Sequence, residues 1–323
     1  MTDPEARRFL HDLSRALGRA PDGTLGVAVS GGPDSMAMLA LAHEALPGRI
    51  AAATVDHGLR PEAADEAALV AGRCAELGVP HATLRPDRPI EGGNLQARAR
   101  DARYRLLAGW AAARGLEAVA TAHHADDQAE TFLMRAARGS GLAGLAGVRA
   151  RAVIEGATVV RPLLDWRRAE LRAVARRRET PFVDDPSNAD LRFDRARARR
   201  LLDEHEWLAP ANVARSAAYL AEADGDLRAT VDWLWAARAK GDGGDVRVDA
   251  ADLPREVRRR LARRAVAEVR AAAGITEPEF TDAANVEALL DGLEAGRRVT
   301  QAGVLASVRE GRWRLRPAPP RRG

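Results

Sequence analysis

The segment VAVSGGPDSMAML (residues 27–39) decides the fold of this chain. An apolar, β-branched run ends at Ser30, two glycines follow, and apolar residues then recur as in a helix that begins at the turn. A glycine-rich turn before a helix N-terminus gathers free backbone N–H groups around an anion, and Gly31 and Gly32 let a phosphate approach the backbone. The hydroxyls of Ser30 and Ser35 add donors. The segment therefore predicts a buried strand, an anion-binding turn and a helix.

This turn differs from two familiar phosphate-binding loops. The Walker A loop requires a lysine after its last glycine, and here none follows; the spacing G-x-G-x-x-G is also absent. Asp34 adds a carboxylate, which fits beside phosphates when a divalent cation such as Mg²⁺ lies between them. The alternative interpretation is an ordinary glycine-rich turn. We take the candidate nucleotide-binding residues of this turn to be Ser30, Gly31, Gly32, Pro33, Asp34 and Ser35.

Around this segment, residues 22–160 alternate short apolar runs with amphipathic stretches. We predict strands over residues 25–30, 49–58, 81–86, 116–124 and 157–163. We predict helices over residues 35–46, 62–78, 94–114 and 126–138. Strands separated by helices form a parallel sheet with right-handed crossovers, so the fold class is α/β with a doubly wound parallel sheet. Ligands bind outside the carboxyl ends of such strands, so the loops after the first, second and fourth strands should form the site.

The loop after the fourth predicted strand carries the second informative motif, HHADDQAET (residues 123–131). Asp126 and Asp127 fall at a predicted helix N-terminus, where the helix dipole favours carboxylates. Asp127 and Glu130 are spaced i, i+3 and share a helix face. Capping is one alternative, and metal binding is another, although the H-E-x-x-H zinc pattern is absent. We favour a functional role, because capping leaves the two histidines that precede the acids unexplained.

The loop after the second predicted strand begins VDHGLR (residues 55–60). Asp56 and His57 lie just beyond the strand, where a purine could rest against the backbone. The alternative is that Pro61 and Glu62 simply start the next helix. Both interpretations stay open, and Asp56 and His57 are kept as candidate adenine-binding residues.

Residues 166–200 form a basic segment. They contain eleven arginines and six acidic residues, a net charge of +5, whereas the whole chain has a net charge of +4. Such a local cluster on a nearly balanced chain is an electrostatic footprint for nucleic acid, and a solvated helix face is the alternative. No C₂H₂, RRM or homeodomain signature occurs, which argues against reading of duplex bases.

After residue 205 the pattern becomes mostly helical. We predict a catalytic domain over residues 1–205 and a helical appendage over residues 206–323, with helices at 211–238, 252–272 and 282–294. The stretch GDGGDVRVDA (241–250) separates the first two helices, and residues 297–317 alternate as in a small β-meander or a short β-hairpin. No run of 18 apolar residues and no signal peptide occurs, so we expect a cytoplasmic protein with no membrane contact.

Together these stretches resemble the tRNA(Ile)-lysidine synthases, a family within the ATP pyrophosphatases, whose pyrophosphate (PP) loop reads S-G-G-x-D-S. The resemblance covers roughly residues 22–205. Besides SGGPDS and VDHGLR it includes RARDARY, HHADDQAETFLMRAARGSGLAGL, RPLLDWRRAELR and VDDPSN. It is weaker after residue 211, although the position of that region fits the tRNA-binding appendage of the family.

The resemblance implies a two-step ligase reaction on the wobble cytidine of tRNA(Ile) with a CAU anticodon. ATP adenylates the oxygen at carbon 2 of the base and pyrophosphate leaves; the ε-amine of free L-lysine then displaces AMP. The implied cofactors are ATP and Mg²⁺, with Asp34 at the metal. Asp127 and Glu130 are the implied acidic partners of the lysine, and the three acids are the candidate catalytic residues. The arginines expected to meet tRNA are Arg103, Arg167, Arg168, Arg195 and Arg197.

Other reactions of PP-loop enzymes are the rival interpretations. Transfer of sulfur to tRNA needs paired cysteines, and Cys74 is the only cysteine of the chain. Ammonia-dependent amidation of a small molecule would not need the basic segment. A nucleotide-sensing module of the same fold would bind ATP without releasing pyrophosphate. The oligomeric state stays open, with a homodimer as one alternative.

Overall fold

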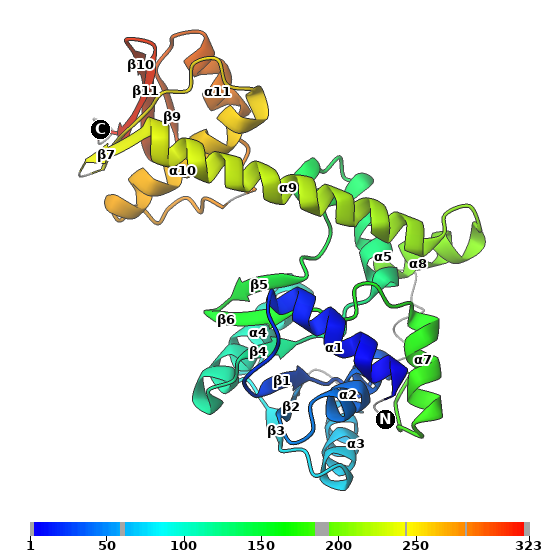
Figure 1. Ribbon diagram of the computed structural model, residues 1–323. Coiled ribbons are helices and arrows are strands. Elements are labelled where there is room, and N and C mark those ends of the chain that lie inside the picture. The colour runs from blue at the N-terminus through cyan, green and yellow to red at the C-terminus, as the bar shows by residue number, and fades with distance from the viewer. Residues whose placement is uncertain (1–2, 59–61, 185–193, 243, 282, 320–323) are drawn as a thin grey trace. The chain divides into compact units, whose positions relative to one another are not determined.

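The computed structural model describes residues 3–58, 62–184, 194–242, 244–281 and 283–319 (Figure 1). The chain divides into two compact units, Met1–Ala221 and Glu222–Gly323, and each has a hydrophobic core of its own. The sequence predicts the boundary after residue 205, whereas the two units of the structure divide inside α9 (Pro210–Arg238). No helix among the described residues combines the length and hydrophobicity that crossing a bilayer requires.

The first unit is built around a six-stranded sheet with the order β3–β2–β1–β4–β6–β5. Neighbouring strands are parallel except for the pair β5–β6. Because β1 lies between β2 and β4, the chain winds outward in both directions from it, and the crevice between the carboxyl ends of β1 and β4 is a topological switch point. The strands are β1 (Leu25–Ala28), β2 (Ile50–Val55), β3 (His81–Leu84), β4 (Ala118–Ala120), β5 (Arg151–Ile154) and β6 (Ala157–Val160).

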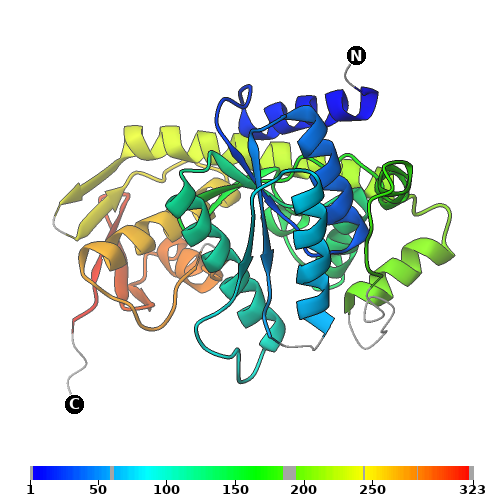
Figure 2. The ribbon, with the colours of Figure 1, turned by 90° about the horizontal axis from the view of Figure 1, so that it is seen from below.

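Helices cover both faces of this sheet, with α4 on one side and α2 and α3 on the other (Figure 2). Buried residues of α1, α2, α3 and α7 form one core with the sheet, and those of α4 form the other. This confirms the predicted doubly wound α/β fold. The helices of this unit before α9 are α1 (Pro4–Leu17), α2 (Pro33–Ala45), α3 (Glu62–Glu76), α4 (Leu95–Arg114), α5 (Ala125–Ala136), α6 (Leu142–Leu145), α7 (Arg168–Arg177) and α8 (Asp194–Glu204).

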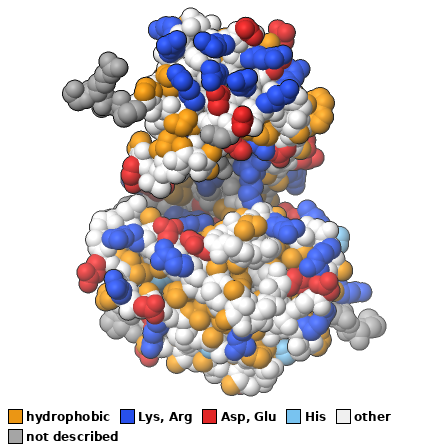
Figure 3. Space-filling model, turned by 90° about the vertical axis from the view of Figure 1, so that its left-hand side faces the viewer, with side chains coloured by type: hydrophobic (Ala, Val, Ile, Leu, Met, Phe, Trp, Pro, Cys, Tyr) orange, Lys and Arg blue, Asp and Glu red, His pale blue; other side chains and the backbone are white. Residues whose placement is uncertain are grey.

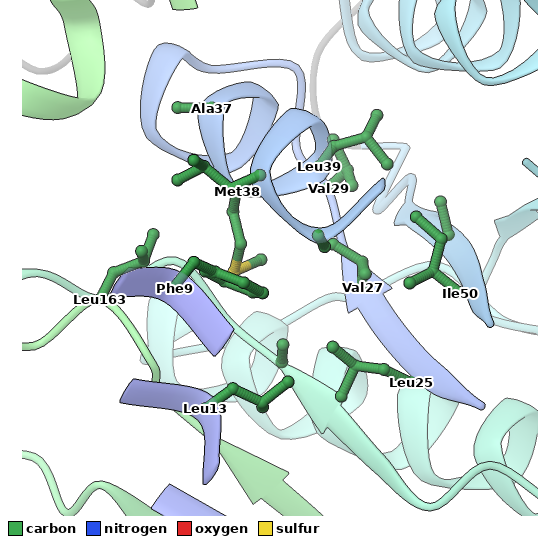
Figure 4. Close-up of a cluster of buried hydrophobic side chains, with 14 of the residues drawn as sticks. Phe9, Leu13, Leu25, Val27, Val29, Ala37, Met38, Leu39, Ile50 and Leu163 are labelled. Atoms are coloured by element: carbon green, nitrogen blue, oxygen red, sulfur yellow. The ribbon is translucent and has the colours of Figure 1, made fainter. Parts of the chain in front are cut away.

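The larger core lies between the sheet and α1, α2 and α7. The side chain of Met38 of α2 reaches towards the ring of Phe9 of α1, and Leu13, Leu25 and Val27 belong to the same cluster (Figure 4). All four residues of β1 are buried, because both of its faces are covered by helices. The core therefore fixes where β1 ends, and so where the SGGPDS turn begins.

The structure of the first unit departs from the predicted elements at β5. Residues 151–154 and 157–160 form an antiparallel hairpin, and only its second strand was predicted. Glu155 and Gly156 have φ values of 51° and 80° and make the turn. β5 is an edge strand that alternates between exposed and half-buried residues, so it lacks the apolar run that indicated the other strands.

The second unit contains more strand than the sequence predicts. A five-stranded antiparallel sheet of order β7–β8–β11–β10–β9 packs against α10 (Arg255–Ala272) and α11 (Glu287–Glu294). The stretch taken as a helix separator forms the hairpin β7–β8. The predicted terminal β-meander or hairpin is the three-stranded antiparallel meander β9–β10–β11. The strands are β7 (Ala239–Asp242), β8 (Asp245–Val248), β9 (Val299–Gln301), β10 (Val304–Arg309) and β11 (Arg312–Pro317).

Candidate active site

The SGGPDS turn connects β1 to α2 and presents backbone donors. Ser35 Oγ accepts a hydrogen bond from the Ser30 N–H at 3.1 Å and donates one to the Gly32 carbonyl at 3.0 Å, so both ends of the turn are tied together. Gly32 caps α2 without any side-chain hydrogen bond to the first turn. The N–H groups at this helix N-terminus therefore face outward and are available to an anion.

Position 31 of the turn requires glycine. Its φ is +86°, and a Cβ there would lie 3.4 Å from the Cβ of Glu66. Its carbonyl accepts a hydrogen bond from the Val183 N–H at 3.0 Å. The chain that follows α7 therefore holds the turn through a backbone hydrogen bond.

His124 joins the loops that follow β1 and β4. Its Nε2 lies 3.3 Å from Asp34 Oδ2 and 3.5 Å from Asp127 Oδ2, and the side chain is only 2% exposed. The Asp127 N–H donates to His124 Nδ1 at 3.3 Å, so in the neutral ring the proton sits on Nε2, between the two carboxylates. The sequence pattern had marked the histidine pair but assigned it no role.

The charges at this junction stabilise one another. Burial disfavours the imidazolium of His124, but the carboxylates of Asp34 and Asp127 outweigh it and raise the pKa of the ring. Burial likewise opposes the charge of Asp127, but His124, His123 and Arg195 outweigh it and lower the pKa of that carboxyl. Asp127 is therefore an anion at neutral pH, although it is largely enclosed.

Two cavities open beside the turn and share Ala28, Ser30 and Arg103 in their linings. The first has a volume of ≈ 220 Å³ and lies over the ends of β1 and β2. The second has a volume of ≈ 180 Å³ and lies over the turn and the start of α5. The first is also lined by Val29, Ala53, Thr54, Val55, His57, Ala63 and Glu66, and the second by Gly32, Asp34, Ser35, Ala122, His123, Asp127 and Arg195.

The two residues predicted to bind adenine are separated by the structure. His57 lines the first cavity, and burial together with the charge of Arg103 lowers the pKa of its ring. Asp56 instead accepts hydrogen bonds from the Gly58 N–H and from Arg85, both at 2.9 Å, which lower the pKa of its carboxyl. Asp56 therefore shapes the loop rather than lining the cavity.

His123 is a second residue of the motif that the prediction left out of the site. It lines the second cavity, while its Nδ1 lies 3.0 Å from Thr121 Oγ1. Burial lowers the pKa of its ring to about 3, so the imidazole is neutral. A neutral ring next to the Asp127 carboxylate offers a polar, uncharged wall to a substrate.

The basic helices α7 and α8 meet the acids of α5. Asp126 accepts two hydrogen bonds from the Arg167 guanidinium at 3.1 Å and one from the Arg168 N–H at 2.8 Å. Glu130 is 1% exposed and accepts from Arg168 at 2.6 Å and from Arg199 at 2.9 Å. Three helices are thus held together by charge-assisted hydrogen bonds.

The remaining predicted tRNA contacts differ in their surroundings. Arg195 lines the second cavity and its Nε lies 3.3 Å from Glu130 Oε2, and Arg103 lies where the two cavities meet. Arg197 points elsewhere and pairs with Asp194 of its own helix. Of the five predicted arginines, Arg103 and Arg195 are therefore the two that line the cavities.

The donors around the turn suit a magnesium ion that also binds phosphate. Oδ1 of Asp34 is buried and accepts no hydrogen bond within the described residues. The same residues contain no group of three or more side chains arranged to hold a metal by themselves. A hard cation held by one or two carboxylates, with phosphate oxygens and water completing its shell, fits this arrangement.

The fold and the site define a class of protein. Residues 5–206 match the model of the PP-loop domain, the ATP-using domain whose loop is the SGGPDS turn. The U34-tRNA thiolase NcsA from Methanococcus maripaludis superposes with a TM-score of 0.56 over 68% of this chain and 79% of its own, at 18% sequence identity. That likeness shows a shared fold.

Closer relatives narrow the class to one family. The tRNA(Ile)-lysidine synthase of Novosphingobium aromaticivorans is 46% identical over 94% of this chain and 91% of its own length. The tRNA(Ile)-lysidine synthase of Zymomonas mobilis is 40% identical over 99% of this chain and 96% of its own length. The chain belongs to the tRNA(Ile)-lysidine synthase family, and is thus a ligase-type, ATP-using tRNA-modifying enzyme.

Proposed function

We propose that this protein joins free L-lysine to carbon 2 of the wobble cytidine of tRNA(Ile) with a CAU anticodon, while ATP is converted to AMP and pyrophosphate. The observation that carries the proposal is the meeting of Asp34 and Asp127 at the buried His124, beside two cavities that share lining residues. An enzyme that binds both a triphosphate and a cationic amino acid needs backbone donors and carboxylates close together, and this site offers both.

ATP would lie along the carboxyl ends of β1 and β2. Its adenine fits the first cavity against Val29, Ala53 and His57, and its phosphates fit the N–H groups at the start of α2. Asp34 would hold Mg²⁺, which when bound would neutralise phosphate charge and assist departure of pyrophosphate. Ser30 and Ser35 would orient the leaving group through their hydroxyls.

The cytosine and the lysine would share the second cavity. A base must leave its stack to be reached by an enzyme, which suits the unpaired anticodon loop. Asp127 would hold the lysine ammonium in this cavity, while Arg103 and Arg195 would attract a phosphate or a carboxylate. Glu130, the other predicted acid, does not line this cavity and is bound by Arg168 and Arg199, so it would affect lysine only through the arginines around it. The ε-ammonium has to lose a proton first; the neutral amine then attacks carbon 2, the bond from carbon 2 to the oxygen breaks, and AMP leaves with that oxygen.

Sulfur transfer, the rival reaction, finds no support in this chain. Cys74 is the only cysteine, it lies buried on α3, and burial raises the pKa of its thiol to about 11. A thiolate that carries sulfur has to be exposed and readily ionised. We propose the cytoplasm as the place of the reaction, because the proposed reaction consumes free lysine and ATP and acts on tRNA.

The direct test is incorporation of radiolabelled lysine. The full chain is incubated with ATP, Mg²⁺, labelled lysine and an unmodified tRNA(Ile) transcript, and we expect alkali-stable label in the RNA with one AMP released per lysine. Asp34→Ala and Ser35→Ala should each abolish incorporation, whereas Asp226→Ala and Ser216→Ala, at exposed positions of α9, should not. Absence of label, or wild-type rates in the first pair, would refute the proposal.

A further inference from the structure

Glu66 is an acid beside the site to which the proposed function assigns no role. It belongs to α3 and lines the first cavity, over the ends of β1 and β2. Ala63 and Val70 share its helix face, because they lie three residues before it and four residues after it. Ala63 lines the same cavity and Val70 is fully buried in the core. This face of α3 is therefore turned inward, and Glu66 stands on it where the core meets the cavity.

The surroundings of Glu66 differ from those of the other acids on its helix. Glu62, Asp65 and Glu76 are exposed, whereas Glu66 is half-buried. On the face of each unit shown in Figure 3, acidic side chains likewise lie at the surface among Lys and Arg side chains. Among the described residues that line the first cavity, Glu66 is the only one with a carboxylate. A carboxylate in such a wall favours a ligand group that donates hydrogen bonds.

The position of Glu66 along the cavity is set by Gly31. A Cβ on Gly31 would lie 3.4 Å from the Cβ of Glu66 and 3.6 Å from its carbonyl oxygen, so glycine lets α3 approach the phosphate-binding turn closely. Ala53 and Val55 of β2, the strand beside β1, line the same cavity. The cavity therefore extends from the turn after β1 to the end of β2, and Glu66 adjoins its turn side.

The chemistry of ATP decides which of its parts Glu66 can meet. ATP carries hydrogen-bond donors in two places, the 6-amino group of adenine and the hydroxyls of the ribose, whereas its triphosphate is an anion that repels a carboxylate. The ribose joins the base to the α-phosphate. When the phosphates lie at the start of α2 and the base against β2, the ribose lies between them, on the side of Glu66. The two oxygens of one carboxylate can accept both ribose hydroxyls.

We propose that Glu66 accepts hydrogen bonds from the 2′- and 3′-hydroxyls of the ATP ribose and makes the protein selective for ribonucleotides over deoxynucleotides. In dinucleotide-binding α/β folds an acid beside the sheet binds a ribose hydroxyl in the same way. A site that binds a hydroxyl rejects an analogue that lacks it, because a polar group of the site is then left unpaired. The inference rests on the proposed function, because that function puts ATP in the first cavity.

The test compares the binding of ATP, 2′-deoxy-ATP and 3′-deoxy-ATP to the full chain. Isothermal titration calorimetry is carried out with Mg²⁺ and without lysine or tRNA, on the wild type, Glu66→Ala and Glu66→Gln. The matched control is Asp65→Ala, which removes the neighbouring, exposed acid of the same helix. Circular dichroism melting verifies that each variant is folded.

We expect the wild type and the control to bind ATP about 10–100-fold more tightly than either deoxynucleotide, the effect of one hydrogen bond to a charged group. In Glu66→Ala the three dissociation constants should agree within about twofold, the scatter of independent effects. Glu66→Gln should keep a ratio of about 2–10-fold, because its amide oxygen still accepts a hydrogen bond but carries no charge.

Equal affinities of the wild type for the three nucleotides would overturn the inference. Wild-type ratios in Glu66→Ala would overturn it as well, because a merely structural role weakens the binding of all three nucleotides equally. If Glu66→Ala instead loses a preference for ATP over inosine triphosphate, which lacks the 6-amino group, and keeps the deoxynucleotide ratios, Glu66 binds the base and the inference is wrong.

The lysine incorporation assay on the wild type decides the proposed function separately, because the titrations contain neither lysine nor tRNA. Ribose selectivity that depends on Glu66, in a protein that incorporates no lysine, would support the role of Glu66 and refute the reaction. Lysine incorporation by a protein that binds the three nucleotides equally would support the reaction and refute the role of Glu66.

Discussion

His124 shows at the scale of one residue how the site is assembled. A single buried imidazole lies within 3.5 Å of carboxylates from two loops, and it is oriented by the Asp127 N–H. Without its Nε2 proton, Asp34 and Asp127 would face one another as unpaired anions in a partly desolvated place. His124 is therefore a positioning residue, because it acts through the two acids.

We predict that His124→Ala lowers the rate of adenylate formation by about 100-fold, because small displacements of reacting groups have effects of this size. The free energy of unfolding should fall by about 1–3 kcal/mol, since the variant leaves buried acceptors without a donor. Single-turnover release of pyrophosphate and urea unfolding provide the two measurements. His11→Ala, an exposed position on α1, is the control, and equal rates in both variants would contradict the role.

Asp127 and Glu130 are distinguishable by what each contacts. Asp127→Asn should raise the KM for lysine by about 10–100-fold, the effect of losing a hydrogen bond to a charged group, and leave the KM for ATP within about twofold. Glu130→Gln should also raise the lysine KM, but with a lower melting temperature, because Arg168 and Arg199 lose a buried partner. An unchanged lysine KM in both variants would exclude these acids as lysine ligands.

At the scale of elements, ion pairs fix the positions of helices that hydrophobic contacts alone would hold less precisely. In the first unit the acids of α5 bind arginines of α7 and α8. In the second unit Glu287 of α11 binds Arg255 and Arg259 of α10. Aromatic residues make up only 4% of the chain, so few large side chains are available to fill the space between helices. The methylene stems of arginine side chains cover part of these surfaces instead.

Glu287 makes the pH dependence of one such connection testable. Arg259 and Arg255 lower the pKa of its carboxyl from 4.5 to about 2. A lowered pKa in the folded state stabilises the fold above pH 4.5, and this contribution is lost as the pH falls towards 2. Because the side chain is 38% exposed, solvent screening limits the effect to below about 1 kcal/mol.

The measurement is urea unfolding of the wild type and of Glu287→Gln at several pH values. The wild type should be the more stable protein at pH 7, and the difference should shrink steadily between pH 4.5 and pH 2. A difference that stays constant over this range, or grows towards low pH, would show that the ion pair is not its source.

At the scale of the whole molecule, the two separate cores predict two unfolding transitions. Leu39 belongs to the core of the first unit and Leu261 to that of the second, and both are fully buried. Leu39→Ala should destabilise the first transition and Leu261→Ala the second, each by about 2–5 kcal/mol. Differential scanning calorimetry resolves the two transitions.

Binding of ATP shows which of the two unfolding transitions belongs to the first unit. ATP binds only the folded first unit in the proposed mechanism, so it should raise the melting temperature of that transition and leave the other unchanged. A single transition that both variants shift equally would show that the two units unfold together.

Much of the first unit could be predicted because its signals are local. The run before Ser30, the glycines after it and the spacing of apolar residues from Met36 to Leu41 predict strand, turn and helix without any distant partner. The same holds for α4 and α5. The hairpins β5–β6 and β7–β8 were missed, because short edge strands with charged residues have no apolar run and form only through pairing.

The sequence by itself determined the identity of the chemical groups: the phosphate-binding turn, the acids of HHADDQAET and the arginines of the basic segment 166–200. Only the tertiary structure decided which of them work together. It placed His124 between Asp34 and Asp127. It directed the carboxylate of Asp56 towards the backbone of its own loop, and it paired Arg167 and Arg168 with acids of α5. The physical reason is that hydrogen bonding and charge neutralisation depend on distances of a few ångströms, which are set by how the sheet and helices pack.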